Sequence, residues 1–236
     1  MGAGASASEY IGIVTIAKRY RSDNYTVLNE YICGKIAQLL HLPVPPFMLV
    51  RDGQDTWFAS AGFTTMGQML PPIDPKQVAQ DVPHIATGVV LFDVLVVNAD
   101  RHAGNLAYVQ ATKQLHVFDH SHALFREHPR GQGLSWLRSC TDKLGITVAD
   151  GAVNRQCLMD YLGAATSIAQ WSDRMARLDD GALSEVFEEA RELGLAPSEA
   201  DEALQFLLRR KVRIQHLVTR HQSEFKGMLQ GGLGNA

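Results

Sequence analysis

Two polar clusters in the sequence contain the residue types needed for phosphoryl transfer. The first has the pattern D-x-x-x-x-N, which begins at Asp100 and ends at Asn105, and the second is Asp119 at the end of an apolar run. Phosphoryl transfer from ATP uses one carboxylate to orient the attacking hydroxyl, together with an Asn and a second Asp that hold Mg²⁺. Mg²⁺ is a hard cation that prefers oxygen ligands, which both Asn105 and Asp119 supply. This combination is typical of a kinase.

Two groups of predicted elements would position these residues. Before a proline-rich linker at residues 71–75, hydrophobic periodicity predicts a helix at 25–40 and strands at 10–17, 47–50 and 56–63. After the linker it predicts a buried, mostly helical segment at 78–97 and a hairpin of strands at 106–108 and 116–118. Further helices are predicted at 154–170, 180–193 and 198–227. This order favours an α+β, bilobal protein-kinase-like fold. The predicted parts are a flexible leader (1–9), a nucleotide-binding N-lobe (10–70) and a larger helical C-lobe (71–236).

The motifs at the two polar clusters resemble those of a known family. The motif D-R-H-x-x-N at residues 100–105, followed by F-D-H-x-H at residues 118–122, is similar to the HipA-like kinases and, more distantly, to the phosphatidylinositol 3/4-kinases. Residues 27–30 and 39–45 also resemble the first lobe of small HipA-like proteins. The resemblance extends over roughly residues 11–125.

The resemblance implies roles for residues of the C-lobe. Asp100 corresponds to the catalytic aspartate, which orients or deprotonates the acceptor hydroxyl. Asn105 and Asp119 would be the Mg²⁺ ligands. In the lipid-kinase pattern the histidine shares the catalytic work, so His102 is a secondary catalytic candidate. The resemblance implies ATP and Mg²⁺ as cofactors and a Ser or Thr of a protein as acceptor, with a lipid acceptor as the alternative.

Lys18 and Glu30 are the corresponding candidates in the N-lobe. Glu30 matches a helix glutamate that pairs with a strand lysine, and Lys18 is the one well-placed lysine before it. Such a pair holds the ammonium group against the α- and β-phosphates of ATP. Only 17 residues precede Lys18, whereas these kinases usually have two strands and a phosphate-covering loop there. Residues 2–8 could form a short loop; an abbreviated lobe, a truncated chain and a partner that completes the lobe stay open.

Each candidate also has an interpretation without catalysis. Asp and Asn favour turns, so Asp100 and Asn105 could simply end the apolar helix. Lys18 belongs to a basic run that is typical of a solvated surface. A pseudokinase or binding module is therefore the non-enzymatic alternative. The presence of Asp100, Asn105 and Asp119 together argues against it, because a degenerate site has no physical need for all three.

Histidines near Asp119 allow a different chemistry. His116, His120 and His122 alternate along the predicted strand, so they could ligate Zn²⁺ or Fe²⁺ in a metal-dependent hydrolase. The same alternation places Asp119 on the opposite face of the strand, which separates it from the histidines. Hydrolysis is therefore a remote alternative to phosphoryl transfer.

Composition restricts the class of protein further. The 236 residues carry a net charge of −3, which gives no electrostatic basis for nucleic acid as a partner. The three cysteines are widely spaced, which indicates a reducing compartment, and no apolar run of about 18 residues predicts a membrane span. A cytoplasmic location is expected. The expected partners are a protein substrate and, from the resemblance, an antitoxin or a protein that completes the N-lobe.

Overall fold

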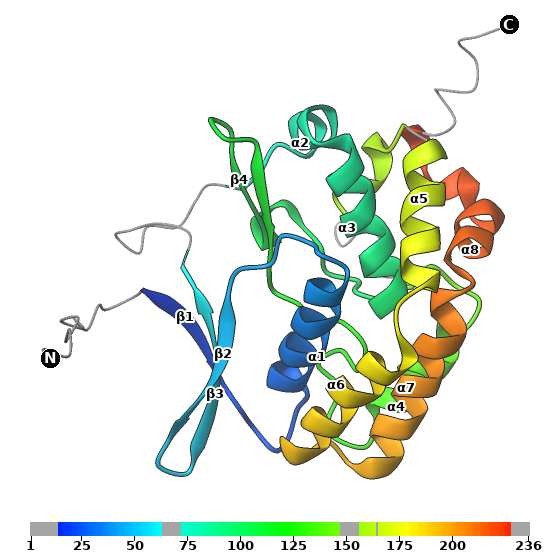
Figure 1. The fold of residues 1–236 in the computed structure, drawn as a ribbon. Helices are drawn as coiled ribbons and strands as arrows, with labels where there is room; N and C mark the ends of the chain where they lie inside the picture. The colour runs from blue at the N-terminus through cyan, green and yellow to red at the C-terminus, as the bar shows by residue number, and fades with distance from the viewer. Residues whose placement is uncertain (1–13, 63–71, 147–155, 164, 228–236) are drawn as a thin grey trace, which may run out of the picture.

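The elements of the chain form two groups (Figure 1). The computed structural model describes residues 14–62, 72–146, 156–163 and 165–227. The first group consists of β1 (Thr15–Arg19), α1 (Thr26–Leu39), β2 (Phe47–Asp52) and β3 (Asp55–Ala61). In Figure 1, α1 lies between this small sheet and the helices of the second group. The predicted leader (1–9), the loop (2–8) and the domain boundary between residues 70 and 71 lie outside the described residues.

The N-terminal sheet is antiparallel and has the strand order β1-β3-β2. Lys18 lies opposite Phe58, and Phe58 lies opposite Leu49, so these side chains share one face of the sheet. Phe47 is on the same face and packs against α1, where a Cβ at Gly34 would lie 2.7 Å from the ring of Phe47. Glycine at this position therefore lets α1 approach the sheet closely, on the face that carries Lys18.

Helix α1 matches the predicted helix at 25–40. Its first turn is supported by Asn24, whose Oδ1 accepts a hydrogen bond from the backbone N–H of Thr26 at 3.1 Å. It buries apolar residues at helical spacing, among them Leu28, Ile32 and Ile36. Two polar residues of this helix, Asn29 and Glu30, are also buried, and both of them contact the segment that follows β5.

The second group is helical apart from one hairpin. It contains α2 (Pro75–Asp81), α3 (Pro83–Val96), β4 (Leu106–Val109), β5 (Gln114–Val117), α4 (Gly133–Ser139), α5 (Ala165–Ala176), α6 (Asp180–Glu192), α7 (Pro197–Lys211) and α8 (Ile214–Arg220). Three-residue 3₁₀ turns are η1 (Ala103–Asn105), η2 (Met159–Tyr161) and η3 (Gln222–Glu224). Helix α3 is buried along most of its length and contacts α5 and α7. It leads directly into the D-R-H-x-x-N segment, so the core positions that segment.

The segment at 78–97 is mostly helical, as predicted, but it is not a single helix. It is divided into α2 and α3, which meet at a bend of 119°. Pro83 begins α3, because proline lacks an N–H and is tolerated only in the first turn of a helix. Among the described residues no single helix is long and apolar enough to span a membrane, and only this bent pair reaches that length and composition when counted together.

Other C-lobe predictions differ from the structure in their boundaries. In place of the helix predicted at 154–170, the described helix is α5, which begins at Ala165. Residues 156–163 form turns and η2, and residues 147–155 lie outside the described part of the chain. The predicted helix at 198–227 is divided into α7 and α8 near Val212. The predicted hairpin is confirmed, with Leu106 of β4 opposite Val117 of β5.

Candidate active site

A cavity of about 190 Å³ lies between the N-terminal sheet, α1 and the end of β5. One part of its wall is apolar and is formed by residues of both groups of elements: Ile16, Val44, Phe47, Phe58 and Val117. The other part is polar and includes the predicted site residues Lys18, Glu30, Asn105 and Asp119. The fold therefore brings together residues that are as far apart in the sequence as positions 18 and 119.

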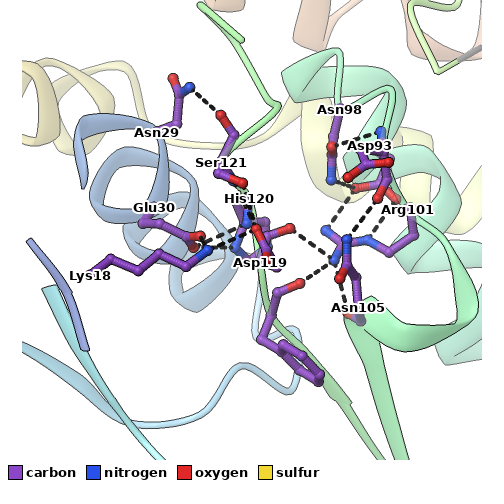
Figure 2. Close-up of polar contacts among 12 residues, drawn as sticks. Lys18, Asn29, Glu30, Asp93, Asn98, Arg101, Asn105, Asp119, His120 and Ser121 are labelled. Carbon is purple, nitrogen blue, oxygen red and sulfur yellow. Dashed lines mark hydrogen bonds and ion pairs between the residues drawn. The ribbon is translucent and has the colours of Figure 1, made fainter. Parts of the chain in front are cut away.

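Lys18 lies between two carboxylates (Figure 2). Its Nζ is 2.5 Å from Glu30 Oε1 and 2.8 Å from Asp119 Oδ1. The side chain of Glu30 is only 3% exposed, so this carboxylate depends on its partners for stabilisation. The predicted pairing of Lys18 with Glu30 is thus present, and the structure adds Asp119 to it.

The charges in this cluster stabilise one another. Burial would lower the pKa of the Lys18 ammonium, but the attraction of Glu30 and Asp119 outweighs burial and raises it. Burial would raise the pKa of the Asp119 carboxyl, but Lys18 and a hydrogen bond from Ser121 outweigh burial and lower it. Asp119 is therefore an anion and Lys18 a cation at neutral pH, which are the forms needed to bind a metal ion and a phosphate.

Residues after Asp119 hold both carboxylates in place. The backbone N–H of His120 donates to Glu30 Oε2 at 3.0 Å, and Ser121 Oγ donates to Asp119 Oδ1 at 2.6 Å. The turn begins with Asp119 in the left-handed region, at φ = 57°. Asn29 of α1 anchors it by donating from Nδ2 to Ser121 O at 2.7 Å. Helix α1 therefore fixes the Asp119 turn through Glu30 and Asn29 together.

Asp100 and Asn105 are tied to each other through the backbone. Asn105 Nδ2 donates to Asp100 O at 2.8 Å, and the N–H of Asp100 donates to Asn98 Oδ1 at 3.2 Å. The amide nitrogen of Asn105 is thus used within the loop, and its oxygen is the end of the side chain that can ligate a cation. The side chain of Asp100 is 28% exposed and lies next to His122, with 3.7 Å between Asp100 Oδ2 and His122 Nε2.

A buried ion pair connects this loop to the Asp119 turn. Arg101 is fully buried and contacts both oxygens of Asp93 on α3 at 3.1 Å. Its Nη1 donates to backbone carbonyls of both segments, those of Asn105 (3.1 Å), Asp119 (3.3 Å) and Phe118. Sequence reasoning missed Asp93 as a positioning residue, although a carboxylate within the apolar run V-V-L-F-D-V-L-V is a detectable signal.

His102 is placed away from the polar cluster. Its ring is exposed, and its Nδ1 accepts a hydrogen bond from the N–H of Gly104 at 3.0 Å, which caps η1. In the described part of the chain no ion pair joins His102 to Lys18, Glu30 or Asp119. Its catalytic role stays a prediction, and its observed role is to shape the loop that holds Asn105.

The prediction that one strand aligns His116, His120 and His122 is wrong. β5 ends at Val117, so His120 and His122 lie on the turn that follows it. The His120 ring packs edge-on against Phe92, with 5.6 Å between ring centroids, whereas His122 lies beside Asp100. Among the described residues there is no group of three or more His, Cys, Asp or Glu side chains arranged to hold a metal ion. The geometric premise of the hydrolase alternative is therefore absent.

A family model and one solved structure indicate the type of fold. A family model described as HipA-like kinase matches residues 12–134. The structure is similar to that of the proinflammatory kinase CtkA of Helicobacter pylori, with a TM-score of 0.56 and 17% identity, over 91% of this chain and 90% of that chain. HipA of Shewanella oneidensis MR-1, solved with HipB and operator DNA, matches with a TM-score of 0.45 and 13% identity, over 89% of this chain and 60% of that chain. A search of curated proteins found no match. The predicted kinase-like α+β fold is confirmed.

Proposed function

Because the chain belongs to the HipA-like kinase family, we propose that it transfers the terminal phosphoryl group of Mg²⁺-bound ATP to a serine or threonine hydroxyl of a protein. The observation that carries the proposal is the convergence of Lys18, Glu30, Asn105 and Asp119 on one cavity with an apolar wall. An apolar slot beside a cation and oxygen ligands suits a ligand that combines a flat base with charged phosphates.

The apolar wall is the proposed site for the adenine base. Phe58 and Ser60 of β3 line the cavity. Trp57 does not line it, because it pairs with Val50 on the other face of the sheet. Lys18 follows Ile16 along β1 on the face toward the cavity, so its ammonium group lies where phosphates attached to such a base would extend.

The donor set fits Mg²⁺. Asn105 offers an amide oxygen and Asp119 a carboxylate held anionic by Lys18, and both line the same cavity. Mg²⁺ would neutralise charge on the phosphates of ATP. Glu30 holds Lys18 beside Asp119, so that the ammonium group and the carboxylate face the same space.

Asp100 is the proposed acceptor of the hydroxyl proton. The proton moves to its carboxylate as the hydroxyl oxygen forms a bond to the terminal phosphorus of ATP. The bond between that phosphorus and the bridging oxygen breaks, and the electron pair leaves with ADP. The backbone contacts of Asp100 to Asn98 and Asn105 fix the loop that carries this carboxylate and the proposed metal ligand Asn105.

A transfer assay with radiolabelled ATP and a cell extract tests the proposal. We expect label on protein in the presence of Mg²⁺ and none when a chelator is added, since the anionic phosphates require the cation. Label in the lipid fraction would contradict the proposed acceptor class and favour a lipid kinase. Binding of Mg²⁺–ATP without any transfer would identify the chain as a pseudokinase.

The Lys18–Glu30 pair gives a separate prediction about the nucleotide. Lys18→Ala and Glu30→Ala are each expected to weaken ATP binding by roughly 10-fold or more, because an unsatisfied buried polar group costs roughly 1–3 kcal/mol and each replacement misplaces the other partner. Calorimetric titration with Mg²⁺–ATP measures the effect. Lys35→Ala is the matched control, since Lys35 of α1 forms an ion pair with Glu189 of α6 but does not line the cavity. A loss with Glu30→Ala alone would show that Lys18 is not the phosphate-binding lysine.

A protein partner and a cytoplasmic location complete the proposal. The family resemblance suggests an antitoxin, and the short segment before Lys18 suggests a protein that completes the N-lobe. The location is expected from the widely spaced cysteines. Affinity purification of the chain from its native cells checks this expectation, because a stable partner would be retained. Recovery of the chain alone, at full transfer activity, would contradict it.

A further inference from the structure

His122 lies close to two carboxylates, one of which is Asp100 of the proposed catalytic loop. Its Nε2 is 3.7 Å from Asp100 Oδ2 and 3.3 Å from Glu127 Oε1. A lone pair on Nε2 would face two anionic groups, so this nitrogen is the one expected to carry hydrogen. The proposed kinase mechanism assigns no role to His122 or Glu127.

The backbone on both sides of His122 is anchored. On one side, Asn29 Nδ2 donates to Ser121 O at 2.7 Å. On the other side, the N–H of Leu124 donates to Val96 O at 2.8 Å, and Asn29 Nδ2 also donates to Arg126 O at 3.0 Å. The histidine is therefore presented by a segment that is fixed to α1 and to the end of α3.

Asp100 is equally fixed, because its N–H and its carbonyl bond to Asn98 and Asn105. The contact between Asp100 and His122 thus joins two rigid backbones. The two side chains are 28% and 31% exposed, and ion pairs at such positions contribute only about 0–1 kcal/mol to stability. Structural stability alone gives little reason for this contact.

We propose that His122 is a positioning residue for the Asp100 carboxylate, an inference that rests on the proposed function. The imidazole lies against Oδ2 at 3.7 Å, so it restricts rotation of the carboxylate and leaves Oδ1 for the acceptor hydroxyl. Glu127 contacts the same ring nitrogen at 3.3 Å and so keeps the imidazole beside the Asp100 carboxylate. Displacement of a reacting group by about 1 Å can cost on the order of 100-fold in rate. Loss of His122 is therefore expected to lower the turnover rate by about 10- to 100-fold.

Steady-state kinetics of the full chain test this inference. His122→Ala is expected to lower kcat by about 10- to 100-fold and to leave KM for ATP and the melting temperature with Mg²⁺–ATP unchanged, because His122 does not line the nucleotide cavity. His122→Gln retains an N–H donor and is expected to restore part of the rate. His128→Asn is the control on the same segment. A normal kcat, or equal losses in kcat and ATP affinity, would overturn the inference.

A double-mutant cycle separates this inference from the proposed function. If His122 acts through the Asp100 carboxylate, His122→Ala should cause no further loss in the Asp100→Asn background. The same fold-loss in both backgrounds would overturn the positioning role and leave the kinase proposal intact. A normal rate for Asp100→Asn itself would overturn the kinase mechanism, whatever the result at His122.

Discussion

Replacing Asp100 by asparagine is expected to slow phosphoryl transfer by about two to four orders of magnitude while leaving the affinity for Mg²⁺–ATP nearly unchanged. Asparagine keeps the size and much of the hydrogen bonding of aspartate, but it lacks the negative charge and the basicity that accept the hydroxyl proton. The backbone bonds of Asp100 to Asn98 and Asn105 do not depend on the side chain, so the loop should persist. Initial rates of transfer and calorimetric titration with Mg²⁺–ATP measure the two quantities.

The exposed residue Asp52 provides the control for this prediction. It lies at the end of β2, away from the cavity, and its change to asparagine alters the net charge by the same amount. Asp52→Asn should therefore transfer phosphate at the normal rate. If Asp100→Asn also did so, the proposed mechanism would be wrong, and His102, the secondary candidate, would be the next residue to test.

Most of the first lobe could be predicted because its signals are local, although the strand predicted at 10–17 is β1 at Thr15–Arg19 and includes Lys18. The spacing of Leu28, Ile32 and Ile36 defines a helix that must end before Pro43, and a turn at Gly53 separates two strands. Lys18 and Glu30 were paired by resemblance, and the structure shows the ion pair. The contact of Lys18 with Asp119 could not be read from the sequence, because it depends on how the two groups of elements pack.

The turn after β5 was the least predictable part of the site. Alternation extended the strand through His120 and His122, but Asp119, Leu124 and Arg126 adopt positive φ values of 57°, 40° and 55°. Non-glycine residues adopt this conformation only when surrounding contacts impose it, so no periodicity signals it. Here Asn29 and Val96 supply such contacts from α1 and α3.

The C-terminal helices show a different limit. Apolar spacing predicted their presence, but it continued across Val82 and Val212, where α2 and α7 end. Pro83 was a visible signal for the first break, whereas the second has no proline or glycine to mark it. Asp93 was the other visible signal, since a carboxylate in the apolar centre of α3 requires a buried partner, which is Arg101.

Replacing Asp119 by asparagine is expected to damage both nucleotide binding and transfer, in contrast to the change at Asp100. Asparagine removes the charged metal ligand and one of the two carboxylates that hold Lys18. Affinity for Mg²⁺–ATP should fall by at least about 10- to 100-fold, the loss typical of changing a residue that merely supports a metal ligand. At 100 times its dissociation constant, Mg²⁺–ATP stabilises a folded protein by about 2.7 kcal/mol. In a chain of this size this corresponds to a rise in melting temperature of about 5–10 °C, most of which Asp119→Asn should lose.

Ser121→Ala is the matched control, because it removes the hydrogen bond to Asp119 Oδ1 (2.6 Å) but keeps the carboxylate and its ion pair with Lys18. It should therefore retain most of the rise in melting temperature. The melting temperature is measured with ATP plus Mg²⁺ and with ATP plus chelator. If Asp119→Asn showed the full rise in melting temperature with Mg²⁺, Asp119 would not be a ligand of the metal. An equal loss in both variants would instead indicate that the shape of the turn, rather than the charge of Asp119, determines binding. Because Asp100 and Asp119 belong to different loops joined by Arg101, a loss of rate alone in one variant and of rate and affinity in the other would assign proton transfer to the first loop and metal binding to the second.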